Sequence, residues 1–535
     1  MNNTISREEF AKGKIEIPRP LSGDAYTIAG EALADQKARD KSVYGVMFRR
    51  SPKDAPEFQG VAQDDRMVSF GLVDYIRNNL TKQVTREQVD EAEKFMQTAH
   101  AFGGPLNFDR RPWDRVVNEF DGYLPLKIQA LPEGSTFYKN EPVVQVESLD
   151  KGFGEIAALV EADMLGMVST GTARATLERH MLERFLDYAK EDMPNATSED
   201  QLLAARLMCH DFSKRAYETP DGSEFLGKAH LLSFPGTDNF DAAYAAYKEN
   251  GGKAVGSSIA ALAHRIVMGY DTEQECFDNL REVAGPGGIA SYLADTYNFK
   301  KAVSENLVPM ALKASKTDGG ILVGRPDSGN HLENSKYILD QARENGLYKV
   351  QNNGRLAMTN LSKISGDSMD WLKTKATMDM QIENNYSPVN CGIVGMGGWF
   401  KRTPTRDTLS TAYKLMAKGE NLESEVKLAD TLAKMSVPGP VQILRGQGTD
   451  QPSTIMHYET PVAGVNTLET FYDASKPGVE KFCDPLLESF GVRSQRVIEG
   501  FANAPLEQRV LSDEIIQIQH QVLADHGRSF SDYKY

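Results

Sequence analysis

The sequence is poor in the features that mark secreted and metal-binding proteins. It has only four cysteines in 535 residues, and they lie far apart, at Cys209, Cys276, Cys391 and Cys483. That spacing matches neither a disulfide framework nor paired metal ligands, so we expect a reducing compartment, the cytoplasm. The first segment, MNNTISREEFAKGK, lacks the apolar stretch of a signal peptide.

Long apolar runs and an excess of positive charge are also missing. No run approaches the roughly 20 apolar residues that cross a bilayer, and the net charge is -15. We therefore expect a soluble protein that binds neither membranes nor nucleic acid over a broad surface. A small anionic ligand stays compatible with this charge, because it needs only a local group of Arg, Lys and backbone N–H groups.

The chain is long enough for two or three domains, and its first half mixes strands and helices. SVYGVMF, directly before Arg49 and Arg50, is typical of a strand. Residues 66–100 show helical spacing and include a Thr-x-x-Gln capping box. Residues 155–190 and 200–217 are also expected to be mainly helical. Near the carboxyl end, VQILRG and STIMHYE predict strands, and SDEIIQIQHQVLADHG predicts a helix.

From about residue 229 to 400 the pattern changes to short apolar runs that alternate with helical stretches. AHLLSF, GILVGR and CGIVGM are such runs. The alternation predicts β-α units and a parallel sheet, with a closed barrel as one form of it. Catalytic residues of such folds lie where strands end, and Asp238, Asp327 and the pair Gly397-Gly398 occupy such positions.

Each candidate segment also has a purely structural interpretation. CHDFSKRAY places Phe212 and Arg215 within one helical turn, as an ordinary amphipathic helix end would. FPGTDNF puts Asp238 where a helix begins, and Asp is a favoured N-cap. VGSSIAALAHRIV predicts an Ala-rich helix with His264 early in it, and a lone helical His more often packs or lies at the surface.

Two later segments are more specific. In GGILVGRPDSGN an apolar strand ends in Arg325, beside Asp327 in a tight turn. A turn explains the Pro, Asp and Gly, but it does not explain an arginine that closes the strand beside a carboxylate. In GMGGWFKRTPTRD a glycine-rich loop precedes several cations, an arrangement that suits a phosphate.

Five segments, in their order along the chain, resemble the nicotinamide and nicotinate phosphoribosyltransferases, specifically the nicotinamide branch. They are HDFSKR, FPGTD, RPDSGN, SGD and GMGGWFKRTPTRD. SVYGVMFRR, VSFGLVDYI and LPLKIQALPEG add to the resemblance, which fades after about Lys414. It implies an α/β fold, an irregular α/β barrel with a second α+β domain built from the N-terminal and C-terminal parts of the chain. We expect an N-terminal α+β region over 1–160, a barrel-like catalytic domain over 161–425, and a C-terminal region over 426–535 that packs back on the N-terminal part.

The implied reaction joins nicotinamide to 5-phosphoribosyl-1-pyrophosphate, giving nicotinamide mononucleotide and pyrophosphate in NAD salvage. The resemblance implies that Phe212 and Arg325 sandwich the pyridine ring, and that Asp295 and Asp327 lie near the ribose and Mg²⁺. The other implied contacts are Tyr26 at the pocket wall from the partner subunit, Arg50 and Arg215 at the pyrophosphate, Gly366 and Asp367 at the ribose, and Gly397, Gly398, Arg406 and Lys414 at the 5'-phosphate. A homodimer with shared active sites is implied as well.

Asp238 favours nicotinamide over nicotinate, because its carboxylate accepts a bond from a carboxamide NH2 and repels a second carboxylate. His264 matches the histidine that becomes phosphorylated when the family couples the reaction to ATP hydrolysis. A nicotinate phosphoribosyltransferase on the same fold stays an alternative. So does a non-catalytic binding protein, which would need no intact set of phosphate- and base-contacting residues. The nucleotide-salvage phosphoribosyltransferases are disfavoured, since no Thr-Gly-Gly-Thr-like loop follows paired acidic residues.

Overall fold

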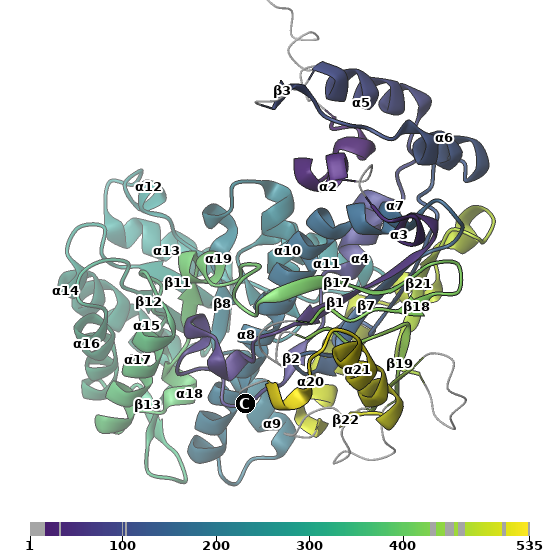
Figure 1. The fold of residues 1–535 in the computed structure, drawn as a ribbon. Helices are drawn as coiled ribbons and strands as arrows, with labels where there is room; N and C mark the ends of the chain where they lie inside the picture. Colours follow the sequence, from purple (N-terminus) through teal and green to yellow (C-terminus); the bar gives the residue numbers. More distant parts are fainter. Residues whose placement is uncertain are drawn as a thin grey trace, which may run out of the picture.

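The computed structural model describes residues 16–30, 34–98, 100–101, 104–428, 435–444, 454–457, 466–504 and 510–532. It contains a parallel barrel and an antiparallel sheet (Figure 1). The long helix α8 (Glu161–Asp192) runs between these two parts and contacts both of them.

Seven short parallel strands make the barrel in the part of the chain that the structure describes. Two sheets, β16-β8-β9 and β10-β11-β12-β15, supply these strands. The parallel bridges Gly236–Ser257 and Ser365–Val394 connect the two sheets on both sides, so that the ring closes. The bounds are β8 (Cys209–Asp211), β9 (Gly236–Thr237), β10 (Ala260–Ala261), β11 (Ile289–Leu293), β12 (Ile321–Arg325), β15 (Leu361–Lys363) and β16 (Val394–Met396).

Helices cover the outside of the barrel and bury its apolar strands. The side chains of Tyr292 and Leu322 pack with Ile338 of the covering helix α16 (His331–Glu344) in one core cluster. Parallel strands covered in this way read as short, nearly continuous apolar runs. Further covering helices, seen around the green and teal strands of Figure 1, are α13 (Glu273–Ala284), α15 (Val308–Lys316) and α17 (Trp371–Glu383).

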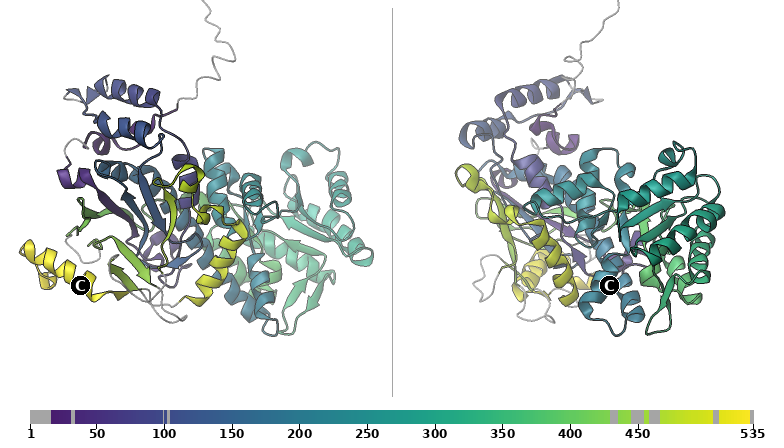
Figure 2. Two further views of the ribbon diagram at one scale, coloured as in Figure 1. Left: turned by 90° about the vertical axis from the view of Figure 1, so that its right-hand side faces the viewer. Right: turned by 180° about the vertical axis from the view of Figure 1, so that it is seen from behind.

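The second part is a six-stranded antiparallel sheet, in the order β18-β17-β1-β7-β5-β21. It takes strands from three distant stretches of sequence, because β17 and β18 follow the barrel and β21 comes from the C-terminal region. The bounds are β1 (Ser42–Phe48), β5 (Leu126–Ala130), β7 (Pro142–Ser148), β17 (Thr411–Lys418), β18 (Glu423–Ser424) and β21 (Glu469–Asp473). Helices α5 (Arg86–Thr98) and α6 (Arg110–Glu119) project beyond this sheet (Figure 2).

Several predicted elements are confirmed. The run SVYGVMF is β1, GILVGR contains β12 and CGIVGM contains β16. Near the carboxyl end, the predicted strands are β19 (Val441–Leu444) and β20 (Thr454–His457), and the predicted helix is α21 (Asp513–Asp525).

Three predictions of local structure are wrong. The first residues of AHLLSF end helix α10 (Pro220–Leu231) instead of forming a strand. The segment CHDFSKRAY is not a helix end, since β8 and the 3-10 turn Ser213–Ala216 occupy it. The predicted Ala-rich helix is also absent, because β10 takes its place and the short helix α12 (His264–Val267) begins only at His264.

None of the described helices combines the length and the hydropathy needed to cross a membrane.

Candidate active site

A cavity of about 560 Å³ lies at the carboxyl ends of the barrel strands, where loop-borne catalytic residues of barrels are found. Eight of the predicted site residues line it: Phe212, Arg215, Arg325, Asp327, Gly366, Asp367, Gly397 and Gly398. They follow β8, β12, β15 and β16, so four separate strands deliver them to one place. Other lining residues include Met369, Trp399, Lys401 and Arg402.

Phe212 and Arg325 face each other across this cavity. The Arg325 guanidinium carbon lies 5.2 Å from the centre of the Phe212 ring. Arg325 donates from Nη2 and Nε to Asp327 Oδ1, at 2.6 and 3.2 Å, so the carboxylate fixes the plane of the guanidinium. The Phe212 N–H donates to the Met396 carbonyl at 2.8 Å, which ties the end of β8 to β16.

Glycines let the backbone approach the Phe212 ring closely. A Cβ added at Gly395 would overlap the ring, and one at Gly397 would lie 3.0 Å from the Phe212 carbonyl oxygen. At Gly366 it would lie 3.3 Å from the ring, whereas at Gly398 it would meet nothing within 4 Å. A side chain at Gly395 is therefore incompatible with the present position of Phe212, whereas side chains at Gly397 and Gly366 would require small shifts of their neighbours. Sequence reasoning overlooked Gly395, although it lies in the glycine-rich segment.

His264, Asp295 and the loop of Asp327 form a connected group. Asp295 Oδ1 lies 3.3 Å from His264 Nε2, and Asp295 Oδ2 accepts a hydrogen bond from Ser328 Oγ at 2.5 Å. The Asp295 side chain is 5% exposed and that of His264 is 44% exposed, so the histidine is the accessible member. Glu273, which sequence reasoning missed, lies beside this group. Burial and then the Asp295 carboxylate raise the pKa of Glu273 to about 7.

Asp295 and Asp327 are the acidic residues of the site that would hold Mg²⁺ together with a substrate. Among the described residues, no group of three or more His, Cys, Asp or Glu side chains is arranged to hold a metal. Mg²⁺ is commonly bound by one or two carboxylates together with substrate phosphates. Asp295 and Asp327 offer such carboxylates, with Asp327 at the cavity wall.

Asp238 stands beside the cavity rather than in its lining. It follows β9, its N–H donates to the Asp211 carbonyl at 3.0 Å, and its carboxylate accepts a short hydrogen bond from Ser258 Oγ. The N-cap of helix α11 (Phe240–Glu249) is Asn239, so the structural interpretation of Asp238 as that cap is wrong. Burial lowers the pKa of the neighbouring His210, with the Asp238 carboxylate opposing the shift.

Four of the predicted site residues lie outside the cavity lining: Tyr26, Arg50, Arg406 and Lys414. Arg50 Nη1 donates to the carbonyls of Asp407 and Thr408, at 2.9 and 3.1 Å, and Lys414 lies on β17. Burial and nearby cations, Arg406 among them, lower the pKa of Lys414. Tyr26, on helix α2 (Ala25–Gly30), is 75% exposed. The structure thus places the cations Arg50, Arg406 and Lys414 apart from the eight predicted residues that line the cavity.

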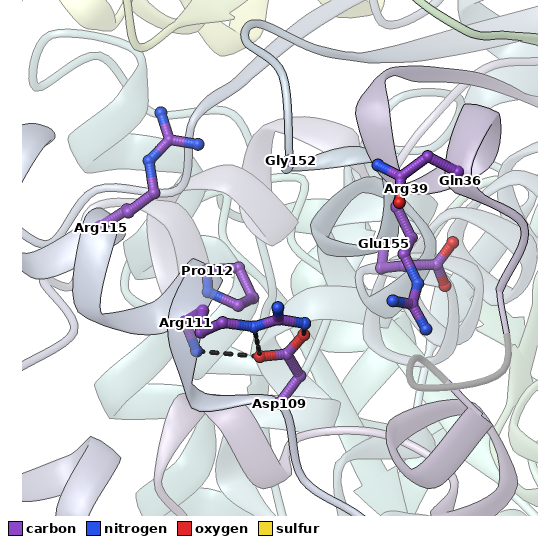
Figure 3. Close-up of a pocket in the computed structure, with 8 residues that line it drawn as sticks. All are labelled: Gln36, Arg39, Asp109, Arg111, Pro112, Arg115, Gly152 and Glu155. Atoms are coloured by element: carbon purple, nitrogen blue, oxygen red, sulfur yellow. Dashed lines mark hydrogen bonds and ion pairs between the residues drawn. The ribbon is translucent and has the colours of Figure 1, made fainter.

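A second cavity, of about 250 Å³, lies among arginines near helix α6 (Figure 3). Arg111 Nη2 binds Asp109 at 2.5 Å, and Arg115 Nη2 binds Glu119 at 2.8 Å. Because these arginines are already neutralised by carboxylates, this cavity is a weaker candidate for an anionic substrate than the barrel cavity.

Two family models match parts of this chain. Residues 207–430 match the Nicotinate phosphoribosyltransferase (NAPRTase) family, and residues 49–128 match the N-terminal domain of nicotinamide phosphoribosyltransferase. The chain belongs to the nicotinate and nicotinamide phosphoribosyltransferase family. The matched region 207–430 contains every residue of the cavity lining. As a family member, the protein is a phosphoribosyltransferase.

Two curated relatives of this family member carry the name nicotinamide phosphoribosyltransferase. A nicotinamide phosphoribosyltransferase of Xanthomonas campestris is 26% identical over 393 residues, which are 72% of this chain and 81% of the relative. Another, of Acinetobacter baylyi, is 28% identical over 416 residues, which are 72% of this chain and 80% of the relative.

Solved structures share the fold of this phosphoribosyltransferase. The human nicotinic acid phosphoribosyltransferase superposes with a TM-score of 0.61 at 16% identity, covering 94% of this chain and 100% of the other. A nicotinate-nucleotide pyrophosphorylase of Pyrococcus furiosus gives 0.55 at 14% identity, covering 94% and 98%. At these identities the likeness concerns the fold, an irregular α/β barrel with a second α+β domain.

Proposed function

We propose that this phosphoribosyltransferase joins nicotinamide to 5-phosphoribosyl-1-pyrophosphate and releases nicotinamide mononucleotide and pyrophosphate, as a step of NAD salvage. The facing pair Phe212 and Arg325 at the barrel cavity carries the proposal. An aromatic face and a planar guanidinium both stack on a flat pyridine ring, each for about 0.5–2 kcal/mol. The match of residues 49–128 to the nicotinamide-type N-terminal domain supports the choice of base.

The reaction needs a place for the base and a counter-charge for the leaving group. A ring between Phe212 and Arg325 requires about 3.5 Å on each face, yet their separation is 5.2 Å. Base entry therefore moves one of the two side chains outward by about 2 Å. Arg215, exposed at the cavity wall, faces the departing pyrophosphate. Asp295 or Asp327, together with substrate phosphates, would hold Mg²⁺, which would supply positive charge beside the departing pyrophosphate.

Asp238 selects nicotinamide over nicotinate in this proposal. Its Oδ1 is engaged by Ser258, and a carboxylate oxygen has further lone pairs for the carboxamide NH2. A nicotinate carboxylate would meet like charge instead. A site built to bond one polar group rejects the wrong analogue by up to about 10⁴–10⁵-fold. Nicotinate transfer is the alternative function on the same fold.

Steady-state rates with each base test this choice. For the wild type, we expect kcat/KM to be at least about 100-fold higher with nicotinamide than with nicotinate. Asp238→Ser removes the charge, so it should narrow that ratio mainly by losing activity with nicotinamide. A wild type that prefers nicotinate, or a ratio unchanged by Asp238→Ser, would contradict the assignment of Asp238.

A homodimer with shared active sites is part of the proposal. The location of Arg50, Arg406 and Lys414 outside the cavity lining supports it, because a second subunit can present such cations to the cavity. Mixing Phe212→Ala subunits with Arg50→Ala subunits tests this. We expect activity to return on mixing, because one of the two sites in a mixed dimer has both native residues. If no activity returned, each site would be built within one chain.

ATP coupling through His264 is a further part of the proposal. The accessible ring of His264, oriented by the buried Asp295, supports a phosphate acceptor role. With ATP and both substrates present, purified wild type should release ADP and phosphate, and His264→Asn should transfer phosphoribose without hydrolysing ATP. No ADP from the wild type would rule the coupling out. We place the reaction in the cytoplasm, which the four free cysteines support.

A further inference from the structure

Four ionisable side chains lie fully buried behind the cavity: Arg174, Glu178, Asp211 and His230, which we call the buried tetrad. Each has an exposed fraction of 0%. Arg174 and Glu178 are one turn apart on α8, His230 is on α10 and Asp211 ends β8. Burying charges is costly unless each is paired, so their mutual contacts decide what the tetrad does.

The four side chains form a continuous chain of ion pairs. Arg174 Nε donates a short hydrogen bond to Glu178 Oε1, and Arg174 Nη2 lies 3.6 Å from Asp211 Oδ1. The other Glu178 oxygen, Oε2, lies 2.7 Å from His230 Nδ1.

His230 completes the charge balance by carrying two ring protons. Its Nε2 lies 2.8 Å from the Gly236 carbonyl oxygen, which only accepts, so Nε2 bears a hydrogen. Its Nδ1 faces the Glu178 carboxylate, and a neutral ring would set two lone pairs against each other there. Burial opposes the imidazolium, but Glu178 outweighs it and the pKa of His230 is raised. The tetrad then has two positive and two negative charges.

The Asp211 end of the tetrad holds the loop that carries Phe212. Asp211 Oδ1 accepts from the Ser213 N–H at 2.8 Å, so its carboxylate closes the turn around Phe212. The Asp211 carbonyl also accepts from the Asp238 N–H at 3.0 Å.

The rest of the tetrad contacts two more segments at the cavity. His230 bonds the carbonyl of Gly236, two residues before Asp238 on the β9 loop. The Arg174 guanidinium carbon lies 3.8 Å from the centre of the Phe400 ring. Phe400 belongs to helix α19 (Gly398–Arg402; labelled in Figure 1), whose first residue, Gly398, lines the cavity.

We propose that Arg174, Glu178, Asp211 and His230 are positioning residues for the pyridine base, which act through Phe212 and Asp238. The inference rests on the proposed function. Apolar residues of similar volume in place of a buried ion cluster are often neutral or stabilising, so stability alone is a weak reason for this tetrad. Orientation of the base-binding loops is the effect that only this arrangement of charges provides.

Glu178→Gln tests the tetrad, because it keeps the side-chain volume while removing the charge that pairs Arg174 and His230. Glu183→Gln is the matched control, five residues further along α8. Glu183 forms an ion pair with the buried Arg179 at 2.7 Å, and Arg179 packs on Phe501 of the C-terminal region, not on the cavity.

We expect Glu178→Gln to raise KM for nicotinamide at least about tenfold, with KM for phosphoribosyl pyrophosphate changed less than about threefold. Glu183→Gln should lower the melting temperature without this split. Equal losses for both substrates, unchanged kinetics, or the same split in Glu183→Gln would overturn the inference.

Hydrogen exchange separates this inference from the proposed function. Mass spectrometry should show faster exchange over 209–217 and 234–240 in Glu178→Gln than in Glu183→Gln. If the wild type forms no nicotinamide mononucleotide, the proposed function fails, and the exchange data then decide whether the tetrad orders these loops. Unchanged exchange over both segments in Glu178→Gln would refute the inference that the tetrad positions these loops.

Discussion

Lys363 is a buried lysine whose replacement by methionine should stabilise the protein. Its side chain on β15 is 0% exposed, and its ammonium donates to Ser365 Oγ at 3.0 Å. Among the described residues it forms no ion pair with a carboxylate. Burial lowers the pKa of Lys363 from 10.5 to about 7. The folded state is therefore destabilised, because the Lys363 ammonium loses the hydration that it has in the unfolded chain.

The size of the effect follows from the change in pKa. A drop in the pKa of Lys363 from 10.5 to about 7 corresponds to at most about 5 kcal/mol of lost folding stability. Apolar replacements of buried ionic groups typically increase the free energy of unfolding by about 1–4 kcal/mol. An unfolding entropy of about 2.1 cal/mol/K per residue over 535 residues converts each kcal/mol into about 1 °C. Lys363→Met should raise the melting temperature by about 1–4 °C at pH 7.

The pH dependence provides the sharper check. Between about pH 7 and 10.5 the unfolded chain holds a proton that folded Lys363 has released, so wild-type stability rises with pH. The Lys363→Met variant lacks this pH dependence, so the difference in melting temperature between it and the wild type should shrink from pH 7 to pH 9. Differential scanning calorimetry of both proteins measures this, with Lys349→Met on the exposed strand β13 (Tyr348–Val350) as control. A lower melting temperature, or an advantage independent of pH, would refute the reasoning.

Three further predictions concern the base-binding wall. Gly395→Ala should raise KM for nicotinamide more than about tenfold because the new Cβ overlaps Phe212. Gly166→Ala on α8, where a Cβ would meet nothing within 4 Å, should leave this KM within about twofold of wild type; equal effects would contradict the packing argument. Arg325→Lys should weaken base binding about 5–30-fold in a titration, since an ammonium cannot stack on the pyridine ring as a planar guanidinium does, and unchanged affinity would exclude the sandwich. His230 has a raised pKa, so its stabilising charge is present below about pH 6.5 and lost as pH rises through that pKa. The melting-temperature advantage of wild type over His230→Asn should therefore be largest near pH 6, and an advantage that grows toward pH 9 would contradict the imidazolium.

The sequence predicted the barrel strands well where an apolar run stops at a charged residue or a glycine-rich loop. GILVGR ends at Arg325 and CGIVGM ends at the glycine-rich loop, and both runs are strands in the barrel. AHLLSF was misassigned because Leu231 and its neighbours are buried in a helix as completely as in a strand. Periodicity alone does not separate a short buried helix segment from a buried strand.

Contacts distant in sequence could not be predicted from the chain alone. The bridges Gly236–Ser257 and Ser365–Val394 close the barrel, and neither follows from local propensity. The same holds for Glu178 and His230, which look like ordinary polar residues of helices until the fold buries them against each other. Glu273 became notable only because folding places it beside Asp295.

Product analysis from a mixture of both bases tests the central claim most directly. Purified protein is given equal concentrations of nicotinamide and nicotinate with phosphoribosyl pyrophosphate and Mg²⁺, and the mononucleotides are separated and counted by mass spectrometry. We predict that nicotinamide mononucleotide exceeds nicotinate mononucleotide by at least about 100-fold, with pyrophosphate formed in equal amount to total mononucleotide. An excess of nicotinate mononucleotide, or no mononucleotide of either base, would contradict it.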